Sequence, residues 1–203
     1  FQAEDGIRDC LLSRGLGYVY KRQFQNTKLT SVTLPNSVTK IGASAFNGCS
    51  LTTINFGQGV KTIENSAFQN CGELTEIILP DATETLGQNA FGDCPKLAKI
   101  SLGKNMKTLE AYCFVGYSKG CPLLGDIICR ATTPPTLKDD YGTGPFGGDW
   151  SPVAGKDVPA ENRIIHLPKS ADLVGGTGAY ADSSWVKLTS STYGFAFKYD
   201  VEG

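Results

Sequence analysis

Apolar and polar residues alternate in short runs that recur along the middle of the chain. Five runs share the form apolar-x-x-apolar-x-apolar; they begin at Leu29, Leu51, Leu74, Leu97 and Leu124. Alternation at the end of each run predicts a strand with one buried face. The side chains expected to point inward are Val32 and Leu34, Ile54 and Phe56, Ile77 and Leu79, and Ile100 and Leu102. The side chains expected to point outward are Thr33, Asn55, Ile78 and Ser101.

A second pattern has the same period. Phenylalanines at 24, 46, 68, 91 and 114 are 22, 22, 23 and 23 residues apart, and the surrounding text recurs, as in "SVTKIGASAFNGCS" and "GVKTIENSAFQNCG". A short apolar pair in each unit is expected to close the wall opposite the strands: Val38/Ile41, Val60/Ile63, Thr83/Leu86 and Met106/Leu109. A Pro or Gly after each strand (Pro35, Gly57, Pro80, Gly103) is expected to turn the chain. A unit of about 23 residues cannot bury its own core, so stability must come from stacking neighbouring units.

The L-x-x-L-x-L form is typical of leucine-rich repeats. The period together with the "AF-x-x-C" box resembles the BspA-like leucine-rich repeats, and the resemblance covers about residues 24–190. It implies a β-rich solenoid, an array of 22–23-residue repeats with a parallel sheet and little helix. It also implies a surface or secreted bacterial protein that adheres to host matrix proteins or other cells.

The repeats divide the chain into segments. Residues 24–130 form the predicted solenoid, with a four-residue insertion between Phe114 and Cys121. Residues 131–190 resemble the family's degenerate last repeat and C-terminal cap, with Tyr180 and Trp185 as expected lids. Residues 191–203 alternate aromatic and other side chains as a strand does. This strand either pairs with the cap or begins a further module, and the pattern favours neither.

Residues 1–23, "FQAEDGIRDCLLSRGLGYVYKRQ", differ from the rest because they show no clean period. They resemble translated sequencing-adapter read-through, so we expect a non-native segment; an irregular native terminus is the alternative. If the segment is non-native, Cys10 is not a candidate functional residue. Because Phe24-Gln25-Asn26 repeats Phe68-Gln69-Asn70, it also predicts further repeats upstream.

Four cysteines occupy one slot of the repeat: Cys49, Cys71, Cys94 and Cys121, with Thr27 in that slot one unit earlier. Stacking would place them about 4.8 Å apart in a column. Side chains that point in parallel do not suit a disulfide, and no zinc-type spacing is present. We therefore predict buried, reduced packing residues, with Cys113 and Cys129 also in the core or its wall.

Composition narrows the function classes. The 203 residues are 40% hydrophobic and 19% charged with net charge −1, which argues against nucleic acid as a partner. No apolar run is long enough to span a membrane. We expect no metal or other cofactor. The acids Asp139, Asp140 and Asp149 lack calcium-ligand spacing.

Candidates for catalysis are few. His166, the single histidine, stands without a recognisable catalytic partner and is expected to be an outward strand residue. "GTGPFG" (142–147) contains a proline and precedes no helix signal, so nucleotide binding is rejected and Phe146 is interpreted as a degenerate repeat phenylalanine. We therefore expect no enzymatic activity.

The outward columns remain as the candidate site. The predicted binding face comprises Thr33, Asn55, Glu76, Ile78, Lys99, Ser101 and Asp126, with Ser31, Thr53 and Ile128 beside them. Glu76, Lys99 and Asp126 alternate in sign, which fits either strand registration or ligand binding. The expected partner of this monomeric, extracellular or surface-located chain is an extracellular protein or glycan. The alternative function is a structural spacer or accessory module in a longer multidomain surface protein, for example a carbohydrate-associated one.

Overall fold

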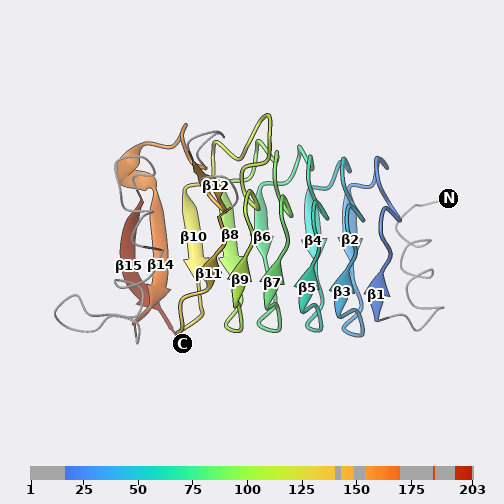
Figure 1. Ribbon diagram of the computed structural model, residues 1–203, viewed down its shortest axis with the longest axis horizontal. Helices are drawn as coiled ribbons and strands as arrows, with labels where there is room; N and C mark the ends of the chain where they lie inside the picture. The colour runs from blue at the N-terminus through green and yellow to red at the C-terminus, as the bar shows by residue number, and fades with distance from the viewer. Residues whose placement is uncertain (1–16, 140–142, 149–153, 170–184, 186–194, 203) are drawn as a thin grey trace.

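A computed structural model describes residues 17–139, 143–148, 154–169, 185 and 195–202. Within these residues the chain winds into a solenoid, and successive turns follow one another from the N-terminal to the C-terminal end (Figure 1). One wall is a six-stranded parallel sheet of two-residue strands. Its order is β1 (Tyr18–Val19), β3 (Lys40–Ile41), β5 (Thr62–Ile63), β7 (Thr85–Leu86), β9 (Thr108–Leu109) and β11 (Thr136–Leu137).

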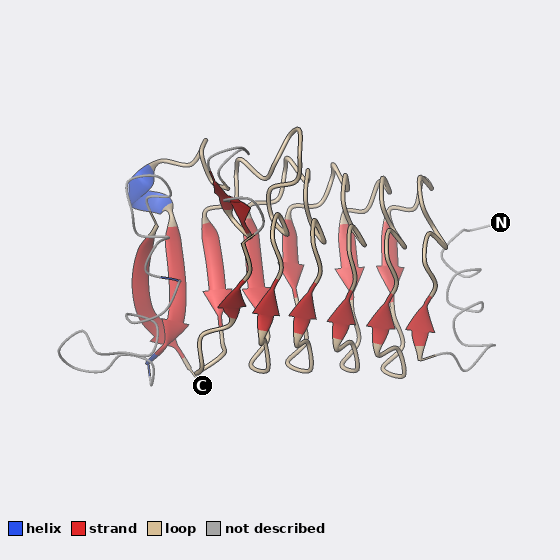
Figure 2. Ribbon diagram, in the orientation of Figure 1, coloured by secondary structure: helices blue, strands red, loops and turns tan. Residues whose placement is uncertain are grey.

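The opposite wall carries the longer strands. Five form one parallel sheet in the order β15 (Ala196–Val201), β14 (Ile164–Pro168), β10 (Asp126–Cys129), β8 (Lys99–Leu102) and β6 (Glu76–Ile78). A separate parallel pair comprises β2 (Ser31–Thr33) and β4 (Thr53–Asn55). The described residues contain little helix, and its one complete described element is the 3-10 turn η1 (Ala160–Asn162) (Figure 2). The predicted β-rich solenoid is confirmed.

The core consists of columns in which equivalent side chains of successive repeats stack. Phe24, Phe46, Phe68 and Phe91 lie with ring centroids 5.1, 5.1 and 5.2 Å apart, nearly parallel. The predicted inward residues are buried, apart from Ile54, which is half-buried. The pairs of the opposite wall, including Thr83, are also buried. The repeat pattern therefore identified the core correctly.

The backbone around each phenylalanine forms a third ladder between repeats. The N–H groups of Phe24, Phe46 and Phe68 each donate to an alanine carbonyl of the next repeat at 2.8 Å. Two residues before and two after each repeat phenylalanine, φ is positive: Arg22 and Asn26, Ser44 and Gly48, Ser66 and Asn70, Asn89 and Asp93, Tyr112 and Gly116. Asn, Asp and Gly tolerate this left-handed conformation best, and one of them stands after every phenylalanine.

The cysteine column has a hydrogen-bonding role that the sequence did not reveal. The thiols of Cys49, Cys71, Cys94 and Cys121 each donate to the carbonyl of a phenylalanine in the preceding repeat, at 3.0–3.4 Å. Thr27, which fills this slot one unit earlier, also supplies a small donor, but it donates at 2.9 Å to the Phe24 carbonyl of its own repeat. All six described cysteines are buried, and Cys49, Cys71, Cys94, Cys113 and Cys121 are free thiols. Burial raises the pKa of the Cys71, Cys94, Cys113 and Cys121 thiols, which disfavours reactive thiolates.

The phenylalanine column ends under a tryptophan. Phe146 stacks on Phe114 at 5.1 Å, which confirms it as the degenerate repeat phenylalanine. Trp185 is fully buried, lies edge-on to Phe146 at 5.9 Å and donates its indole N–H to the Pro135 carbonyl at 2.8 Å. These contacts fit the expected lid. Tyr180 lies outside the described residues.

Both ends of the chain add strands to the walls. Tyr18 and Val19 pair in parallel with Lys40 and Ile41, so residues 17–23 extend the first turn. An open sheet edge can pair with any strand of compatible pattern. The pairing therefore does not test whether residues 1–23 are native. At the other end β15 lies parallel to β14, the arrangement expected of a terminal strand. The domain boundaries themselves stay predictions.

The insertion after Phe114 folds around one buried carboxylate. Asp93 is 3% exposed and accepts hydrogen bonds from the backbone N–H groups of Tyr117, Ser118, Lys119 and Gly120 at 2.6–3.1 Å. Burial opposes ionisation of Asp93, but these four donors outweigh it and hold the pKa of the carboxyl below its usual range. The extra residues thus form a loop with a defined backbone.

The wall of longer strands is interrupted once, between β4 and β6. No ladder joins these two strands, although β5 and β7 behind them pair normally. The registers of the neighbouring pairs, β2–β4 and β6–β8, indicate which groups lie at the break. The peptide groups of Ile54 on β4 face those of Glu76 and Ile78 on β6. The sequence predicted one continuous face, and that expectation is wrong here.

A large side chain accounts for the break. Phe56 fills the slot that holds leucine in other repeats, and its ring lies edge-on to Phe68 at 5.6 Å. Its 3% exposure shows that the extra bulk is accommodated inside the solenoid. Because packed interiors have little free space, an oversized residue moves its neighbours. We infer that Phe56 holds β4 away from β6.

Phe56→Leu should close the break, because leucine fits this slot at Leu34, Leu79 and Leu102. Hydrogen exchange of the β6 backbone amides, followed by NMR, should slow in the variant, while the amides of β7 keep their rates. Unchanged exchange in β6 would rule out Phe56 as the cause.

Asp93→Asn should destabilise the protein by about 1.5–3 kcal/mol at neutral pH, the usual worth of hydrogen bonds to a charged group. The folded pKa of Asp93 is lowered, so its contribution is complete above the unfolded value of about 3.9 and is lost as the pH falls through the folded pKa. Urea denaturation at pH 7 and pH 2.5 should therefore show the gap between wild type and variant shrinking in acid. A gap that stays constant or widens would contradict this role.

Candidate functional site

The candidate site is the outer face of the strands β2, β4, β6, β8 and β10. Thr33, Asn55 and Glu76 are exposed, and Lys99 and Asp126 are half-buried. Ile78 is 60% exposed, which makes it the most exposed large apolar side chain of these strands. Registers Glu76↔Lys99↔Asp126 and Ile78↔Ser101↔Ile128 place the six residues in two rows. The structure therefore brings together the members on β6, β8 and β10, while Thr33 and Asn55 lie beyond the break.

Two residues contribute less surface than expected. Ser101 points outward, but it is only 8% exposed because the isoleucines of the adjacent strands, Ile78 and Ile128, flank it. Ile128 itself is half-buried rather than exposed. Short side chains between longer cross-strand neighbours lose accessibility in this way. Ser101 is thus a poor contact residue, contrary to its place in the predicted face.

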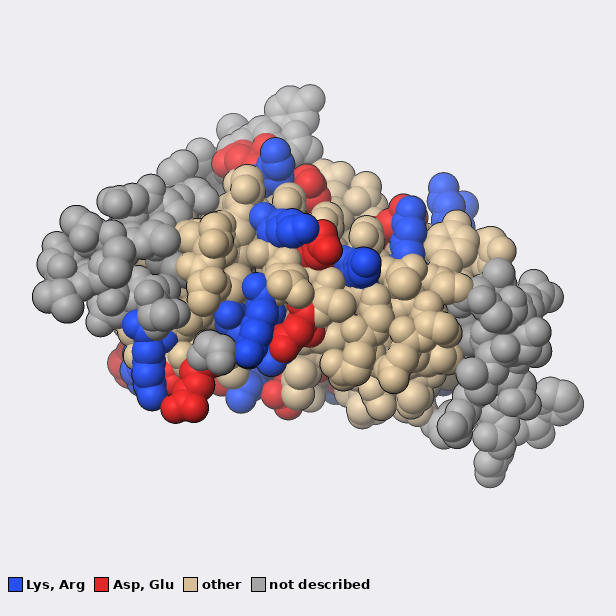
Figure 3. Space-filling model, turned by 90° about the horizontal axis from the view of Figure 1, so that it is seen from below, with Lys and Arg blue, Asp and Glu red and all other residues tan. Residues whose placement is uncertain are grey.

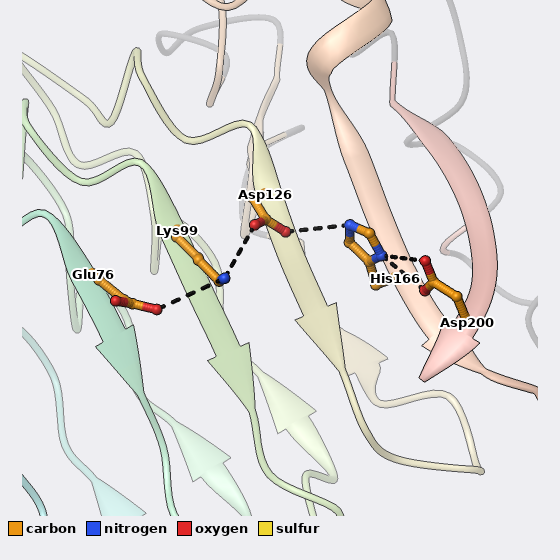
Figure 4. Close-up of polar contacts among 5 residues, drawn as sticks. All are labelled: Glu76, Lys99, Asp126, His166 and Asp200. Atoms are coloured by element: carbon orange, nitrogen blue, oxygen red, sulfur yellow. Dashed lines mark hydrogen bonds and ion pairs between the residues drawn. The ribbon is translucent and has the colours of Figure 1, made fainter. Parts of the chain in front are cut away.

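The charged residues of the face form a diagonal series across five strands (Figure 4). Lys99 lies between Glu76 and Asp126, with Nζ–O distances of 3.9 and 3.4 Å. His166 on β14 continues the series: its Nε2 lies 3.4 Å from Asp126, and its Nδ1 lies 2.8 Å from Asp200 on β15. Carboxylates alternate with nitrogen-bearing side chains throughout. Such pairs fix the register of neighbouring strands, and exposed ones contribute little stability each.

His166 has partners that the sequence could not reveal. Its ring is held between two carboxylates, Asp126 on one side and Asp200 on the other (Figure 4). Asp200 lies 34 residues away and reaches the ring only because β15 pairs with β14. Both ring nitrogens face carboxylate oxygens. The arrangement ties β15 to the rest of the sheet.

The break between β4 and β6 opens a shallow cleft beside this face. Its lining includes half-buried Ile54, exposed Ile78 and, at one end, the ion pair of Asp81 with Arg130 at 3.0 Å. Arg130 also donates to the Leu79 carbonyl at 3.1 Å, so its guanidinium closes the end of β6. A second groove lies on the opposite wall, over Gly87 between Glu64 and Glu110. Neither feature was predicted.

Other chemical candidates find no support within the described residues. No group of three or more His, Cys, Asp or Glu there is arranged to hold a metal ion. Residues 143–148, which include most of "GTGPFG", form an antiparallel hairpin of β12 (Thr143–Gly144) and β13 (Gly147–Gly148), and a hairpin is not the strand-to-helix turn that a phosphate-binding glycine motif requires. Asp139 is exposed; Asp140 and Asp149 lie outside the described part of the chain. None of the described helical segments has the length and apolarity that a membrane crossing requires.

The surface charge is mixed. On the face seen in Figure 3, acidic and basic side chains lie interspersed over the middle and C-terminal turns, and the turns nearer the N-terminus show a broad uncharged area. Among the coloured residues of this face there is therefore no large basic patch of the kind that attracts nucleic acid.

Comparisons with known proteins agree on the fold. The Treponema pallidum leucine-rich repeat protein aligns over 90% of this chain and 78% of its own, with a TM-score of 0.59 and 22% identity. A leucine-rich cell surface protein from Faecalibacterium prausnitzii aligns with a TM-score of 0.52 and 26% identity, over 56% of this chain. The alignment spans only 30% of that protein's length. A search of the curated proteins gives no match.

The repeat family itself is identified at the sequence level. The family described as BspA type leucine-rich repeat region matches residues 16–123, more than half of the chain, in six copies. Those copies coincide with the stacked turns, the phenylalanine column and the thiol column. Leucine-rich repeats of this type are scaffolds without enzymatic chemistry of their own. This chain belongs to the BspA-type leucine-rich repeat family.

Proposed function

We propose that the chain is a non-enzymatic interaction module of a bacterial surface protein and that it adheres to host matrix proteins or other cells. The observation that carries the proposal is the outer sheet face, in which Glu76, Ile78 and Lys99 stand in register on adjacent strands. The likeness to a cell surface protein of Faecalibacterium prausnitzii supports the location.

The face has the features of a recognition surface. Ile78, 60% exposed, is an apolar anchor with the polar groups of Glu76 and Asn55 around it. Interfaces commonly combine an apolar centre with a polar rim. Solenoids also present extended binding surfaces because each repeat adds one strand to a regular array. The cleft at the break deepens the surface beside Ile78.

The charged side chains of the face already pair with one another, which limits the charge that they offer to a partner. Lys99 is engaged by Glu76 and Asp126, and His166 by Asp126 and Asp200. Lys99 is the only lysine in the series, so it is the one ammonium group that this row offers to an acidic group of a partner. Charged pairs at an interface rim mainly set specificity and association rate.

The same internal pairing favours a second candidate function. If the charges serve only to register the strands, the module acts as a structural spacer in a longer surface protein. The two functions differ in what happens when the face is altered while the fold is kept.

Lys99→Glu and Ile78→Ser should each weaken binding of the full chain to an immobilised matrix protein by about tenfold, the effect expected of an interface anchor. Surface plasmon resonance against a panel of extracellular-matrix proteins measures this. Lys96→Glu is the matched control, because Lys96 carries the same charge but pairs with Glu73 outside the strands. Thermal melts should confirm that all three variants are folded.

Two results would contradict adhesion through this face. One is that no panel protein or cell type retains the wild-type chain, which favours the spacer. The other is that Lys99→Glu, Ile78→Ser and Lys96→Glu bind as the wild type does.

A further inference from the structure

A single histidine joins three adjacent strands at the C-terminal end of the sheet. His166 on β14 lies between Asp126 on β10 and Asp200 on β15 (Figure 4). Its Nδ1 lies 2.8 and 2.9 Å from the two oxygens of Asp200, and its Nε2 lies 3.4 Å from Oδ1 of Asp126. We call these three residues the histidine clasp.

Both contacts of the clasp need a proton on the ring. A carboxylate only accepts hydrogen bonds, and a neutral imidazole carries one N–H, so it can donate to one of its two neighbours. Whichever nitrogen holds that proton, the other turns a lone pair toward a carboxylate. The imidazolium ion has an N–H on each nitrogen and carries a positive charge. The geometry around His166 therefore matches the protonated ring.

An oxygen atom without a hydrogen bond supports the same conclusion. Oδ1 of Asp126 is shielded from solvent and accepts no hydrogen bond within the described part of the chain. Lys99 approaches the other oxygen, Oδ2, at 3.4 Å. Leaving a shielded carboxylate oxygen without a donor is costly. A positive charge on the half-buried ring of His166, whose side chain is 23% exposed, offsets that cost.

The other charged groups near the ring face solvent or pair with each other. In register with His166 stand Ile128 on β10 and Lys198 on β15. Lys198 is exposed, so water screens its repulsion of a protonated ring. Lys169 pairs with Glu202 at 3.3 Å, just beyond the ends of β14 and β15. The two carboxylates of the clasp thus dominate the electrostatics at the ring.

We propose that the histidine clasp is a pH-sensitive link that holds β15 firmly while the ring is protonated and loosens when the ring loses its proton. Histidine ordinarily changes its charge between about pH 5 and 8, and carboxylates and lysines ordinarily keep theirs over this range. Stability that depends on the protonated ring is present at the acidic end and is lost as the pH rises. The link concerns the strand and needs no ligand, so it stands independently of the proposed adhesion.

Hydrogen exchange of the β15 backbone amides in the full chain, followed by NMR at about pH 5.5 and about pH 8, tests the proposal. The rates are compared as protection factors, which correct for the pH dependence of exchange itself. Protection of β15 should fall by about two- to fivefold at the higher pH, the effect expected of one partly exposed ion pair. The amides of β7 and β9 on the opposite wall should keep their protection.

Three variants separate the clasp from other effects of pH. His166→Gln, which keeps a side-chain donor but does not titrate, should remove the difference between the two pH values. Asp200→Asn, which removes the carboxylate beside Nδ1, should lower β15 protection at the acidic pH and shrink the difference. Glu202→Gln is the matched control, because Glu202 follows the same strand but pairs with Lys169. It should keep the wild-type difference.

The proposal is overturned if the wild type protects β15 equally at both pH values or protects it better at the higher one. It is also overturned if the difference persists in His166→Gln. Circular dichroism should confirm that each variant folds. If His166→Gln does not fold, Asp200→Asn decides, and an undiminished difference in that variant overturns the proposal.

Discussion

The structure depends on contact between equivalent side chains of successive repeats. A repeat of this length has too few apolar residues to fold alone, so each turn is stable only against its neighbours. Apart from Trp185, the largest fully buried side chains are phenylalanines of one column, whose rings lie 5.1–5.2 Å apart over the first four repeats. The cysteine column adds a thiol donor to each phenylalanine carbonyl. Side-chain and backbone groups thus bind each turn to the next at the same place.

Departures from the repeat create the molecule's individual features. Phe56 in a leucine slot separates β4 from β6 and opens a cleft beside Ile78. The insertion after Phe114 closes around Asp93 and presents Tyr117. His166 and Asp200 tie the last strand to the sheet. Because the regular turns supply the stability, single repeats can carry such changes, and candidate functions concentrate where the regularity fails.

The sequence was sufficient to predict which side chains recur in the core and on the surface, although it did not reveal the thiol hydrogen bonds between repeats. The core residues, the burial of the thiols and the outward rows follow from alignment of the repeats. A wrong assignment of a position in one repeat is corrected by the equivalent positions in the others. Features that occur once were missed. The pairing of His166 with Asp200 needs the β14–β15 register, and the accessibility of Ser101 depends on neighbours at other strands. The break at Phe56 is a packing effect, and a pattern of apolar positions does not distinguish leucine from phenylalanine.

The stabilities of two phenylalanine variants test the central claim, that nearest-neighbour stacking holds the fold. Phe68 lies between two rings, whereas Phe24 has one described ring neighbour and is only partly buried. Urea denaturation should show Phe68→Ala losing about 3–5 kcal/mol, the usual cost of a buried phenylalanine, and Phe24→Ala losing clearly less. Equal losses, or a small loss for Phe68→Ala, would contradict the account.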